Sequence, residues 1–252
     1  MPRPAVLVTG GARRIGEAIV RRFATEGWHV VIHCHGSEDA ARALAAELPS
    51  AEVVVCDLID IGAAIAMIED LAPRLADWRV LVNSASVFRP DDVLKLDSRT
   101  FAEAMRVNAT SPAAMAQAFL RCARSPAGRR VIDLTDQKLA NPNPDFFSYT
   151  VSKHALAATV PLLAMAAAPA DRVYALAPGA ILASHDQLPE ETEVSHRMNL
   201  LGRRTGLDEV VEAAWFLATG PLASGQTLFV DSGQHLLSQP RDVMFLARGE
   251  TG

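Results

Sequence analysis

The chain has 252 residues; half of them are hydrophobic, about a fifth are charged, and the formal net charge is −5. This length and apolar content are enough to bury the core of one large α/β domain or of two small ones. The charge provides no basic field that would attract nucleic acid or an anionic membrane, so we expect neither as a partner.

Short apolar runs alternate with longer segments of helical period along the whole chain, which is the pattern of βαβ units. The runs are continuous in Val, Ile and Leu, as is typical of strands covered by helices on both faces. We predict one α/β domain over residues 1–252, a doubly wound Rossmann fold whose parallel seven-stranded sheet is flanked by helices on both faces. The predicted strands are Ala5–Thr9, His29–His33, Glu52–Cys56, Val80–Val82, Arg130–Leu134, Arg172–Ala177 and Thr227–Val230.

Two regions do not fit this alternation. The stretch 180–204 is polar and contains Pro and Glu, which predicts a loop or a short helix lying over a substrate site. The C-terminal tail 236–252 is interrupted by Pro240 and Gly249, so its course is not predicted.

The cysteines and the apolar segments indicate the compartment. Cys34, Cys56 and Cys122 are scattered without paired spacing, which is typical of reduced cysteines in the cytoplasm. The start of the chain runs into a strand-like segment without a long apolar leader, and the longest apolar stretch, Leu162–Ala168, is too short to span a bilayer. We therefore expect a soluble cytoplasmic protein.

The first predicted strand ends in the glycine-rich segment Thr9–Gly16, which opens an amphipathic helix. Glycine allows the backbone to turn sharply and approach a pyrophosphate, while the helix N-terminus offers unpaired N–H groups. The alternative is an ordinary tight turn beside solvated arginines. The strand–turn–helix setting favours a dinucleotide site, and the residues predicted to bind the cofactor here are Gly10, Arg13, Arg14, Ile15 and Gly16.

The end of the second predicted strand distinguishes NADPH from NADH. NAD sites of this type place Asp or Glu there for the ribose 2′-OH, but this chain has no acid before Glu38. Arg13 with His35, Gly36 and Ser37 is the predicted site of a 2′-phosphate, so NADPH (NADP+) is favoured. A metal pair of His33 and His35 is the alternative, but two ligands without partners make a poor site, so we predict no metal.

Polar residues also follow the third and fourth predicted strands. Asp57 and Leu58 come after the third, where Asp57 is suited to accept a hydrogen bond from an adenine amino group or to cap a helix. Asn83, Ser84 and Ala85 close the fourth. We predict that all five residues line the cofactor.

Tyr149 and Lys153 carry the predicted chemistry. They lie four residues apart, which places a phenol and an ammonium on the same face of a helix. A nearby cation favours the phenolate, so we predict a pKa for Tyr149 lowered from about 10 toward neutrality. Such a pair is common by chance, but together with the glycine-rich turn it indicates hydride transfer and a proton donor usable near pH 7.

These motifs resemble the short-chain dehydrogenase/reductase family, and the likeness covers nearly the whole chain. The family's TGxxxGxG, NNAG and YxxxK correspond to Thr9–Gly16, Asn83–Ser86 and Tyr149–Lys153. Its later Pro-Gly and Asp-Gly-Gly correspond to Pro178-Gly179 and Asp231-Ser232-Gly233. The resemblance implies an oxidoreductase in which Tyr149 and Lys153 are catalytic and also bind the nicotinamide half of the cofactor, with Pro178 and Gly179. It also implies a catalytic role for Asn108, which anchors a water chain to Lys153; the alternative is an asparagine that satisfies local backbone.

Asp136 departs from the family pattern. It lies thirteen residues before Tyr149, where most members have a serine that donates to a substrate carbonyl oxygen. A carboxylate there would repel the developing alkoxide, so we infer a substrate with N–H or amino groups, or a proton relay to Tyr149. Thr135 is one residue earlier and is expected to point to the other face of the strand.

The Asp136–Tyr149–Lys153 set with Arg14 in the turn resembles the pteridine reductases and dihydromonapterin reductases. This subgroup implies that Phe88 covers a flat pterin ring and that Ser86 and Arg14 contact its polar groups or the cofactor phosphate. Three positions differ from the subgroup: Phe146 stands for a tyrosine, Gly36 for an arginine, and Pro178–Leu182 lacks a threonine.

The prediction is therefore an NADPH-dependent reductase that transfers hydride to the C=N bond of a dihydropterin, giving a tetrahydropterin, with Tyr149 as proton donor. The alternatives are a carbonyl or 3-oxoacyl reductase and an NADP(H)-binding protein without turnover. Family likeness further implies a homotetramer or homodimer formed by the helices at Asn108–Arg124 and Ser152–Ala168. Burial within one chain explains the apolar second helix equally well.

Overall fold

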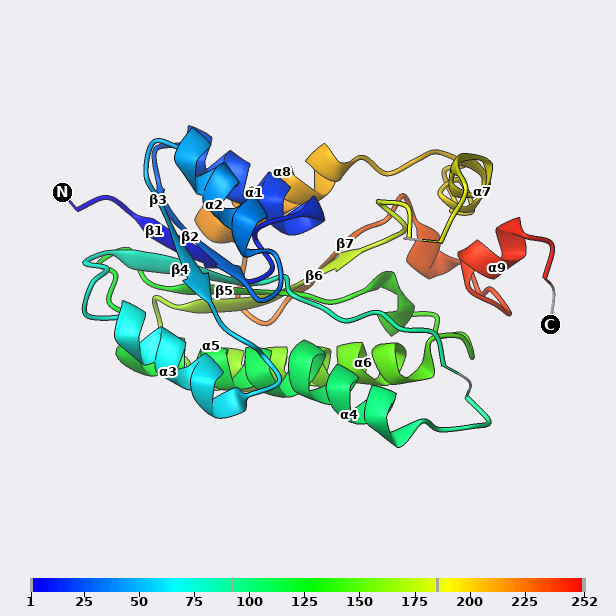
Figure 1. Ribbon diagram of the computed structural model, residues 1–252, viewed down its shortest axis with the longest axis horizontal. Helices are drawn as coiled ribbons and strands as arrows, with labels where there is room; N and C mark the ends of the chain where they lie inside the picture. The colour runs from blue at the N-terminus through cyan, green and yellow to red at the C-terminus, as the bar shows by residue number, and fades with distance from the viewer. Residues whose placement is uncertain (1, 92, 185, 251–252) are drawn as a thin grey trace.

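The computed structural model describes residues 2–91, 93–184 and 186–250. Its strands form one parallel seven-stranded sheet in the order β3-β2-β1-β4-β5-β6-β7 (Figure 1). This confirms the predicted fold class. The strands are β1 (Ala5–Val8), β2 (His29–Cys34), β3 (Ala51–Val55), β4 (Trp78–Asn83), β5 (Arg130–Leu134), β6 (Arg172–Pro178) and β7 (Thr227–Val230).

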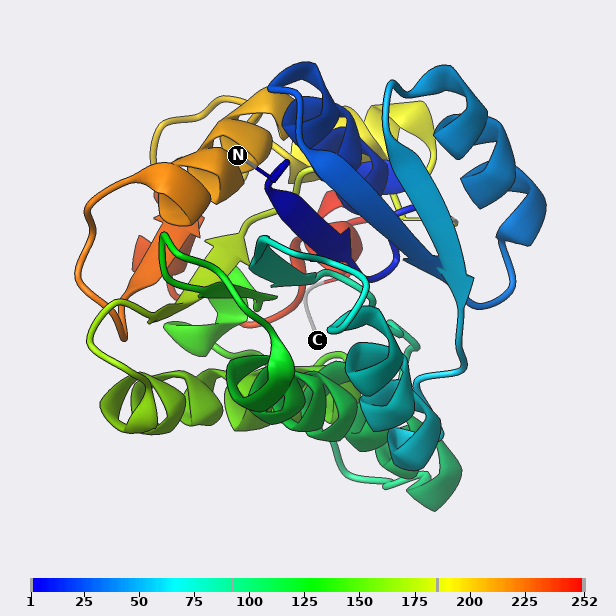
Figure 2. The same ribbon diagram turned by 90° about the vertical axis from the view of Figure 1, so that its left-hand side faces the viewer.

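Helices cover both faces of the sheet, and Figure 2 shows the three layers. One face carries α1 (Arg14–Thr25), α2 (Glu38–Glu47) and α8 (Leu207–Thr219). The other carries α3 (Ile61–Leu71), α4 (Ser98–Met105), α5 (Ser111–Cys122) and α6 (Phe147–Ala166). Two short helices, α7 (Pro189–Ser195) and α9 (Val243–Ala247), lie side by side beyond the end of the sheet.

The sheet separates two apolar cores, because successive side chains of each strand point to opposite faces. Val6 and Val8 belong to the core under α1, α2 and α8, whereas Ala5 and Leu7 belong to the core over α3 and α5. All four are buried. This explains why the strands are apolar runs rather than alternating sequences.

The predicted strand positions are confirmed, with shifted ends. Residues 130–134 and 227–230 agree as predicted, while β4 begins at Trp78, two residues earlier, and ends at Asn83. Trp78 is fully buried and stacks edge-on against Phe119 at 5.0 Å, so the strand extends through the polar Arg79. An apolar-run criterion misses such ends because polar residues interrupt the run.

The strand order reverses at β1, which pairs with β2 on one side and β4 on the other. In open parallel sheets, ligands bind beyond the carboxyl ends of the strands at such a switch point. The predicted excursion 180–204 lies at this end and contains α7, and the tail contains α9. His185, Thr251 and Gly252 of those two predicted segments lie outside the described residues.

Within the described ranges, no helix has both the length and the apolar character needed to cross a membrane.

Candidate active site

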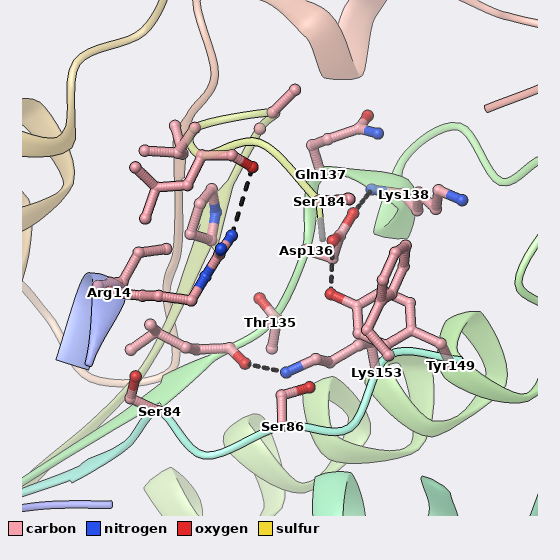
Figure 3. Close-up of a pocket in the computed structure, with 18 of the residues that line it drawn as sticks. Arg14, Ser84, Ser86, Thr135, Asp136, Gln137, Lys138, Tyr149, Lys153 and Ser184 are labelled. Carbon is pink, nitrogen blue, oxygen red and sulfur yellow. Dashed lines mark hydrogen bonds between the residues drawn. The ribbon is translucent and has the colours of Figure 1, made fainter. Parts of the chain in front are cut away.

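A cavity of about 420 Å³ opens at the carboxyl ends of the strands (Figure 3). Its walls come from segments that are far apart in the sequence. The predicted site residues that line the cavity are Gly10, Arg13, Arg14, Ile15, Gly16, Ser84, Ala85, Ser86, Phe88, Asp136, Tyr149, Lys153, Pro178 and Gly179. The other predicted residues, His35, Gly36, Ser37, Asp57, Leu58, Asn83 and Asn108, do not line this cavity.

The glycine-rich turn is closely packed against its neighbours. Gly10 has a φ of 64°, a left-handed conformation that favours glycine, and a Cβ there would lie 3.0 Å from Ala85 Cα. A Cβ on Gly16 would lie 2.3 Å from the carbonyl oxygen of Gly10. The turn therefore keeps its shape only with glycine at both positions, and it leaves the N-terminus of α1 facing the cavity.

His33 fixes the turn from behind. Its Nδ1 accepts a hydrogen bond from the backbone N–H of Gly10 at 3.2 Å, so Nε2 carries the proton and donates to the Cys56 carbonyl at 3.0 Å. Burial lowers the pKa of His33 to about 4, so the ring is neutral. The histidine is a structural link between β1, β2 and β3, and the described residues contain no metal-binding group of three or more ligands.

Arg14 reaches across the cavity. Its backbone has a φ of 56°, and its guanidinium donates to the Ala183 carbonyl at 3.0 Å and to the Leu182 carbonyl at 3.4 Å (Figure 3). The side chain thus connects the glycine-rich turn with the segment after β6. Arg13 is the N-cap residue of α1 and is exposed at the same edge.

Tyr149 and Asp136 form a direct pair. The Tyr149 hydroxyl donates to Asp136 Oδ2 at 2.7 Å, and the backbone N–H of Lys138 donates to Asp136 Oδ1 at 2.8 Å (Figure 3). Tyr149 comes from the first turn of α6, and Asp136 follows β5 as the cap of a short 3₁₀ turn. Thr135 turns its hydroxyl to the Leu176 carbonyl at 3.2 Å, so the carboxylate is the group presented to Tyr149.

Lys153 does not contact the Tyr149 hydroxyl. Its Nζ donates to the Leu134 carbonyl at 2.7 Å and lies 5.6 Å from the centroid of the Tyr149 ring. Burial lowers the pKa of Lys153 to about 8, although Asp136 and Asp133 oppose this shift. Burial disfavours the charged form of an acid too, and it therefore raises the pKa of Asp136.

The prediction of an acidic Tyr149 is wrong for this structure. Burial and then the adjacent charge of Asp136 raise the pKa of Tyr149 well above its usual 10. The physical reason is proximity: the carboxylate touches the hydroxyl, whereas the ammonium is held by a backbone carbonyl. Tyr149 is therefore a protonated donor at neutral pH.

Asn108 lies in a π-helical turn, Arg106–Thr110, between α4 and α5. Its Oδ1 accepts from Val87 N at 2.8 Å, and its Nδ2 donates to the Val87 carbonyl at 2.9 Å and to Ser152 Oγ at 3.0 Å. Ser86 also donates to Oδ1, at 3.2 Å. The side chain thus holds the segment after β4 against α6 through contacts with distant residues and not through backbone of its own helix.

Aromatic rings form the wall beside Tyr149. Phe88 stacks on Phe146 with centroids 4.1 Å apart and meets the Tyr149 ring edge-on at 4.7 Å. Phe146 is buried and has a φ of 56°. Phe146 and Tyr149 also pack against Met244 of the tail. One face of Phe88 is therefore covered by protein, and its exposed part lines the cavity.

The residues predicted for the adenosine half lie at the open ends of β2 and β3. His35 and Gly36 are exposed, and His35 Nδ1 is 3.9 Å from Asp57 Oδ1. Asp57 accepts from Ile59 N at 2.9 Å, while Asp60 caps α3 by accepting from Ala63 N. The alternative prediction of Asp57 as a helix cap is therefore wrong, because the cap of α3 is Asp60, three residues later.

A buried polar pair lies beneath the cavity. Asn83 Nδ2 donates to Asp133 Oδ1 at 2.7 Å across β4 and β5. Asn83 Oδ1 and Asp133 Oδ2 are both buried and have no hydrogen-bond partner within the described chain. Burial raises the pKa of Asp133 to about 6. Asn83 thus supports the sheet rather than the cavity wall.

The sequence did not predict that the C-terminal tail forms part of the cavity wall. The C-terminal tail supplies Asp242, Val243 and Met244, held in place by an ion pair of 2.7 Å between Lys138 Nζ and Asp242 Oδ2. Arg241 pairs with Asp145 at 2.8 Å. The segment 180–204, predicted to lie over the site, contributes Ala180, Ile181, Leu182, Ser184, Gln187, Ser195 and His196. The further lining residues, which were not predicted, are Leu134, Thr135, Gln137, Lys138 and Gln234.

Comparison with known proteins gives matches over nearly the full chain. A family model described as enoyl-(acyl carrier protein) reductase matches residues 10–235. The crystal structure of FolM alternative dihydrofolate reductase 1 from Brucella canis complexed with NADP is 36% identical, with 94% of this chain and 96% of that chain covered and a TM-score of 0.87. Dihydromonapterin reductase of Citrobacter koseri is 25% identical, with 92% and 96% covered. The 3-oxoacyl-(acyl-carrier-protein) reductase FabG of Haemophilus influenzae is 27% identical, with 91% and 97% covered.

Proposed function

This chain belongs to the short-chain dehydrogenase/reductase family, and from that premise we propose that it is an NADPH-dependent reductase of dihydropterins. One observation carries the choice of substrate: a carboxylate, Asp136, binds the hydroxyl of Tyr149 at 2.7 Å. In a carbonyl reductase the oxyanion formed from C=O would develop beside that carboxylate and be repelled. A ring nitrogen that takes up a proton is compatible with it.

The residues at the nucleotide end fit NADPH. Gly10 and Gly16 keep the turn in its closely packed shape, and α1 begins there beside two arginines, which suits a pyrophosphate. The first acid after β2 is Glu38, four residues beyond the end of the strand and paired with Arg42 Nε at 2.8 Å, so the strand end itself offers no carboxylate to a ribose 2′-OH. Arg13, His35 and Ser37 remain as the proposed contacts of the 2′-phosphate.

The mechanism assigns a role to each side chain around Tyr149. Bound NADPH supplies the hydride that is added to the carbon of the substrate C=N bond. Tyr149 donates its hydroxyl proton to the nitrogen of that bond, and its high pKa keeps the proton in place until the nitrogen becomes basic. Asp136 accepts a hydrogen bond from the hydroxyl and so orients it. Because the Asp136 side chain is half-buried, it connects the hydroxyl to solvent, from which the proton is replaced. Lys153 is proposed to bind the nicotinamide ribose.

The shape of the cavity supports a flat substrate. Phe88 presents a ring next to Tyr149, and stacking on an aromatic face is favourable for a planar heterocycle. Ser86 lies on the same wall, and its hydroxyl oxygen keeps acceptor capacity after donating to Asn108. Ser86 and Arg14 are the proposed polar contacts of the pterin ring.

A 3-oxoacyl reductase is the second candidate, because the Haemophilus influenzae relative carries that name. The arrangement of Tyr149 and Lys153 suits either reaction, so Asp136 is the residue that separates them.

An NADPH-oxidation assay tests the proposal. The substrates are 7,8-dihydropterins with short hydroxylated side chains, dihydrofolate, acetoacetyl thioesters and simple ketones. We expect kcat/KM to be highest for a dihydropterin. Turnover of the thioester well above every dihydropterin would establish the second candidate, and binding of NADPH without turnover of any substrate would contradict both.

A further inference from the structure

Gln234 lines the same cavity as Tyr149 and has a defined orientation. It begins the 3₁₀ turn Gln234–Leu236 after β7 and is only 4% exposed, yet it lines the cavity. Its Oε1 accepts a hydrogen bond from the backbone N–H of Ala180 at 3.0 Å. A backbone N–H can only donate, so this bond fixes which end of the amide is oxygen.

The other end of the Gln234 amide is without a partner. Nε2 donates to no residue in the described part of the chain, and it is not among the fully buried atoms without a partner, so it is open to the cavity that Gln234 lines. A donor that is held in one orientation and open to a cavity is suited to an acceptor atom of a ligand. The signal in the sequence is the glutamine directly after Asp231-Ser232-Gly233.

The surrounding backbone holds Gln234 in place. A Cβ on Gly179 would lie 2.7 Å from Gln234 Oε1 and 2.7 Å from Asp231 Cβ, so the absence of a side chain at 179 permits this contact. Asp231 accepts from Gly233 N at 3.0 Å and from His235 N at 2.6 Å, which fixes the turn. The Nε2 donor is therefore preorganised, because these contacts hold the Gln234 side chain in one orientation.

The chemistry of this wall identifies the ligand group. The segment Pro178–Leu182 has no hydroxyl or amide side chain, so Gln234 brings the side-chain donor to it from β7. Tyr149 and Lys153 line the same cavity, so a ring that passes hydride to a substrate beside Tyr149 would bind within reach of this cavity wall. The polar substituent of a nicotinamide ring is its carboxamide, whose oxygen is an acceptor.

We propose that Gln234 positions the nicotinamide ring by donating from Nε2 to the carboxamide oxygen. The inference rests on the proposed function, because it takes NADPH as the cofactor. Gln234 thereby supplies a side-chain donor beside the Pro178–Leu182 segment, which has none of its own. It is a positioning residue that sets which face of the ring is turned to the substrate.

The test measures binding rather than turnover. Gln234→Glu keeps an oxygen for Ala180 N and replaces the donor with an acceptor. The dissociation constants of NADPH and of 2′-phospho-ADP-ribose, which lacks the nicotinamide ring, are measured by fluorescence and calorimetry. We expect NADPH to bind about 5- to 100-fold more weakly to the variant, with 2′-phospho-ADP-ribose unchanged. Gln226→Met, at an exposed glutamine before β7, is the control and should leave both constants unchanged.

Each other outcome contradicts a defined part of the account. Failure of the unsubstituted protein to bind NADPH overturns the proposed function itself. Equal weakening of both ligands, unchanged NADPH binding, or a change confined to the KM of the dihydropterin overturns the role of Gln234. Binding of 2′-phospho-ADP-ribose also reports that the variant is folded. If Gln234→Glu does not bind it, the uncharged Gln234→Met is judged by the same criterion, and loss of binding there too would make Gln234 a fold residue and overturn the proposal.

Discussion

The two ends of the cavity are built in different ways. The nucleotide end centres on one local segment, Thr9–Gly16, whose shape is set by glycines that pack closely against backbone of the turn itself and of Ala85. The substrate end is assembled from the segments after β4, β5 and β6 and from the tail, whose Met244 touches Tyr149 although the two are far apart in the sequence. The first end is thus fixed by glycine geometry, and the second by side-chain contacts between distant segments.

This difference separates binding from chemistry. Changes at the nucleotide end should alter cofactor affinity and leave the proton donor intact, whereas changes at the substrate end should do the reverse. The following variants break or sharpen that separation.

Tyr149→Phe should have the largest effect, because it removes the proton donor at the substrate end. We expect kcat for the dihydropterin to fall by about 10²- to 10⁴-fold, with the dissociation constant of NADPH unchanged. Steady-state kinetics and fluorescence titration check the two parts. Tyr174→Phe is the matched control, since Tyr174 is the other tyrosine of the chain and its hydroxyl donates to the Leu222 carbonyl, away from the cavity. It should lower stability without changing kcat, and an equal loss of kcat in both variants would contradict the assignment.

Gly16→Ala should act on the nucleotide end alone. The new Cβ would lie 2.3 Å from the Gly10 carbonyl oxygen, so the turn must shift, and we expect NADPH to bind about 10-fold or more weakly. Gly62→Ala in α3 is the control, because its Cβ would meet only the side-chain oxygen of Asp60 at 3.2 Å. Unchanged NADPH affinity in Gly16→Ala would show that the turn does not hold the pyrophosphate.

Asp133→Asn should change the free energy of unfolding through the buried Asn83–Asp133 pair beneath the cavity. The raised pKa of Asp133, about 6, means that the folded state keeps this proton up to about pH 6 and is destabilised as pH rises through that value. An asparagine stays neutral and can donate to the unpaired Asn83 Oδ1. We expect a free energy of unfolding higher by about 1–3 kcal/mol at pH 8, and little difference at pH 4, by urea denaturation. Asp70→Asn, exposed on α3, should show neither effect. A stability gain at pH 4 as large as at pH 8 would contradict ionisation of Asp133.

The fold was predictable because its signals are local. Apolar runs, the glycine-rich turn and the Tyr149–Lys153 spacing each lie within a few residues, and each corresponds to one element of the structure. The sequence pattern did not predict the two ends of β4, Trp78-Arg79 and Asn83, because contacts with distant residues stabilise them.

The candidate site was predictable only in part. Asp136 and Tyr149 are joined as their thirteen-residue spacing suggested, but the pKa of Tyr149 moves upward because burial and Asp136 outweigh Lys153. No local pattern places Gln234 or Asp242 in the cavity, since both arrive through turns whose course depends on tertiary packing. The spacing of two residues within a helix can be recognised in the sequence. The direction of a pKa shift cannot, because it depends on burial and on the charges that distant segments bring close.

The most direct test of the account is the ratio of kcat/KM for a dihydropterin to that for acetoacetyl thioester, measured in the unsubstituted protein and in Asp136→Ser. The account predicts a ratio far above one in the unsubstituted protein and a fall of about 100-fold or more in the variant, because the serine would favour an oxyanion and the carboxylate disfavours it. A ratio below one in the unsubstituted protein, or a ratio that stays unchanged in Asp136→Ser, would contradict it.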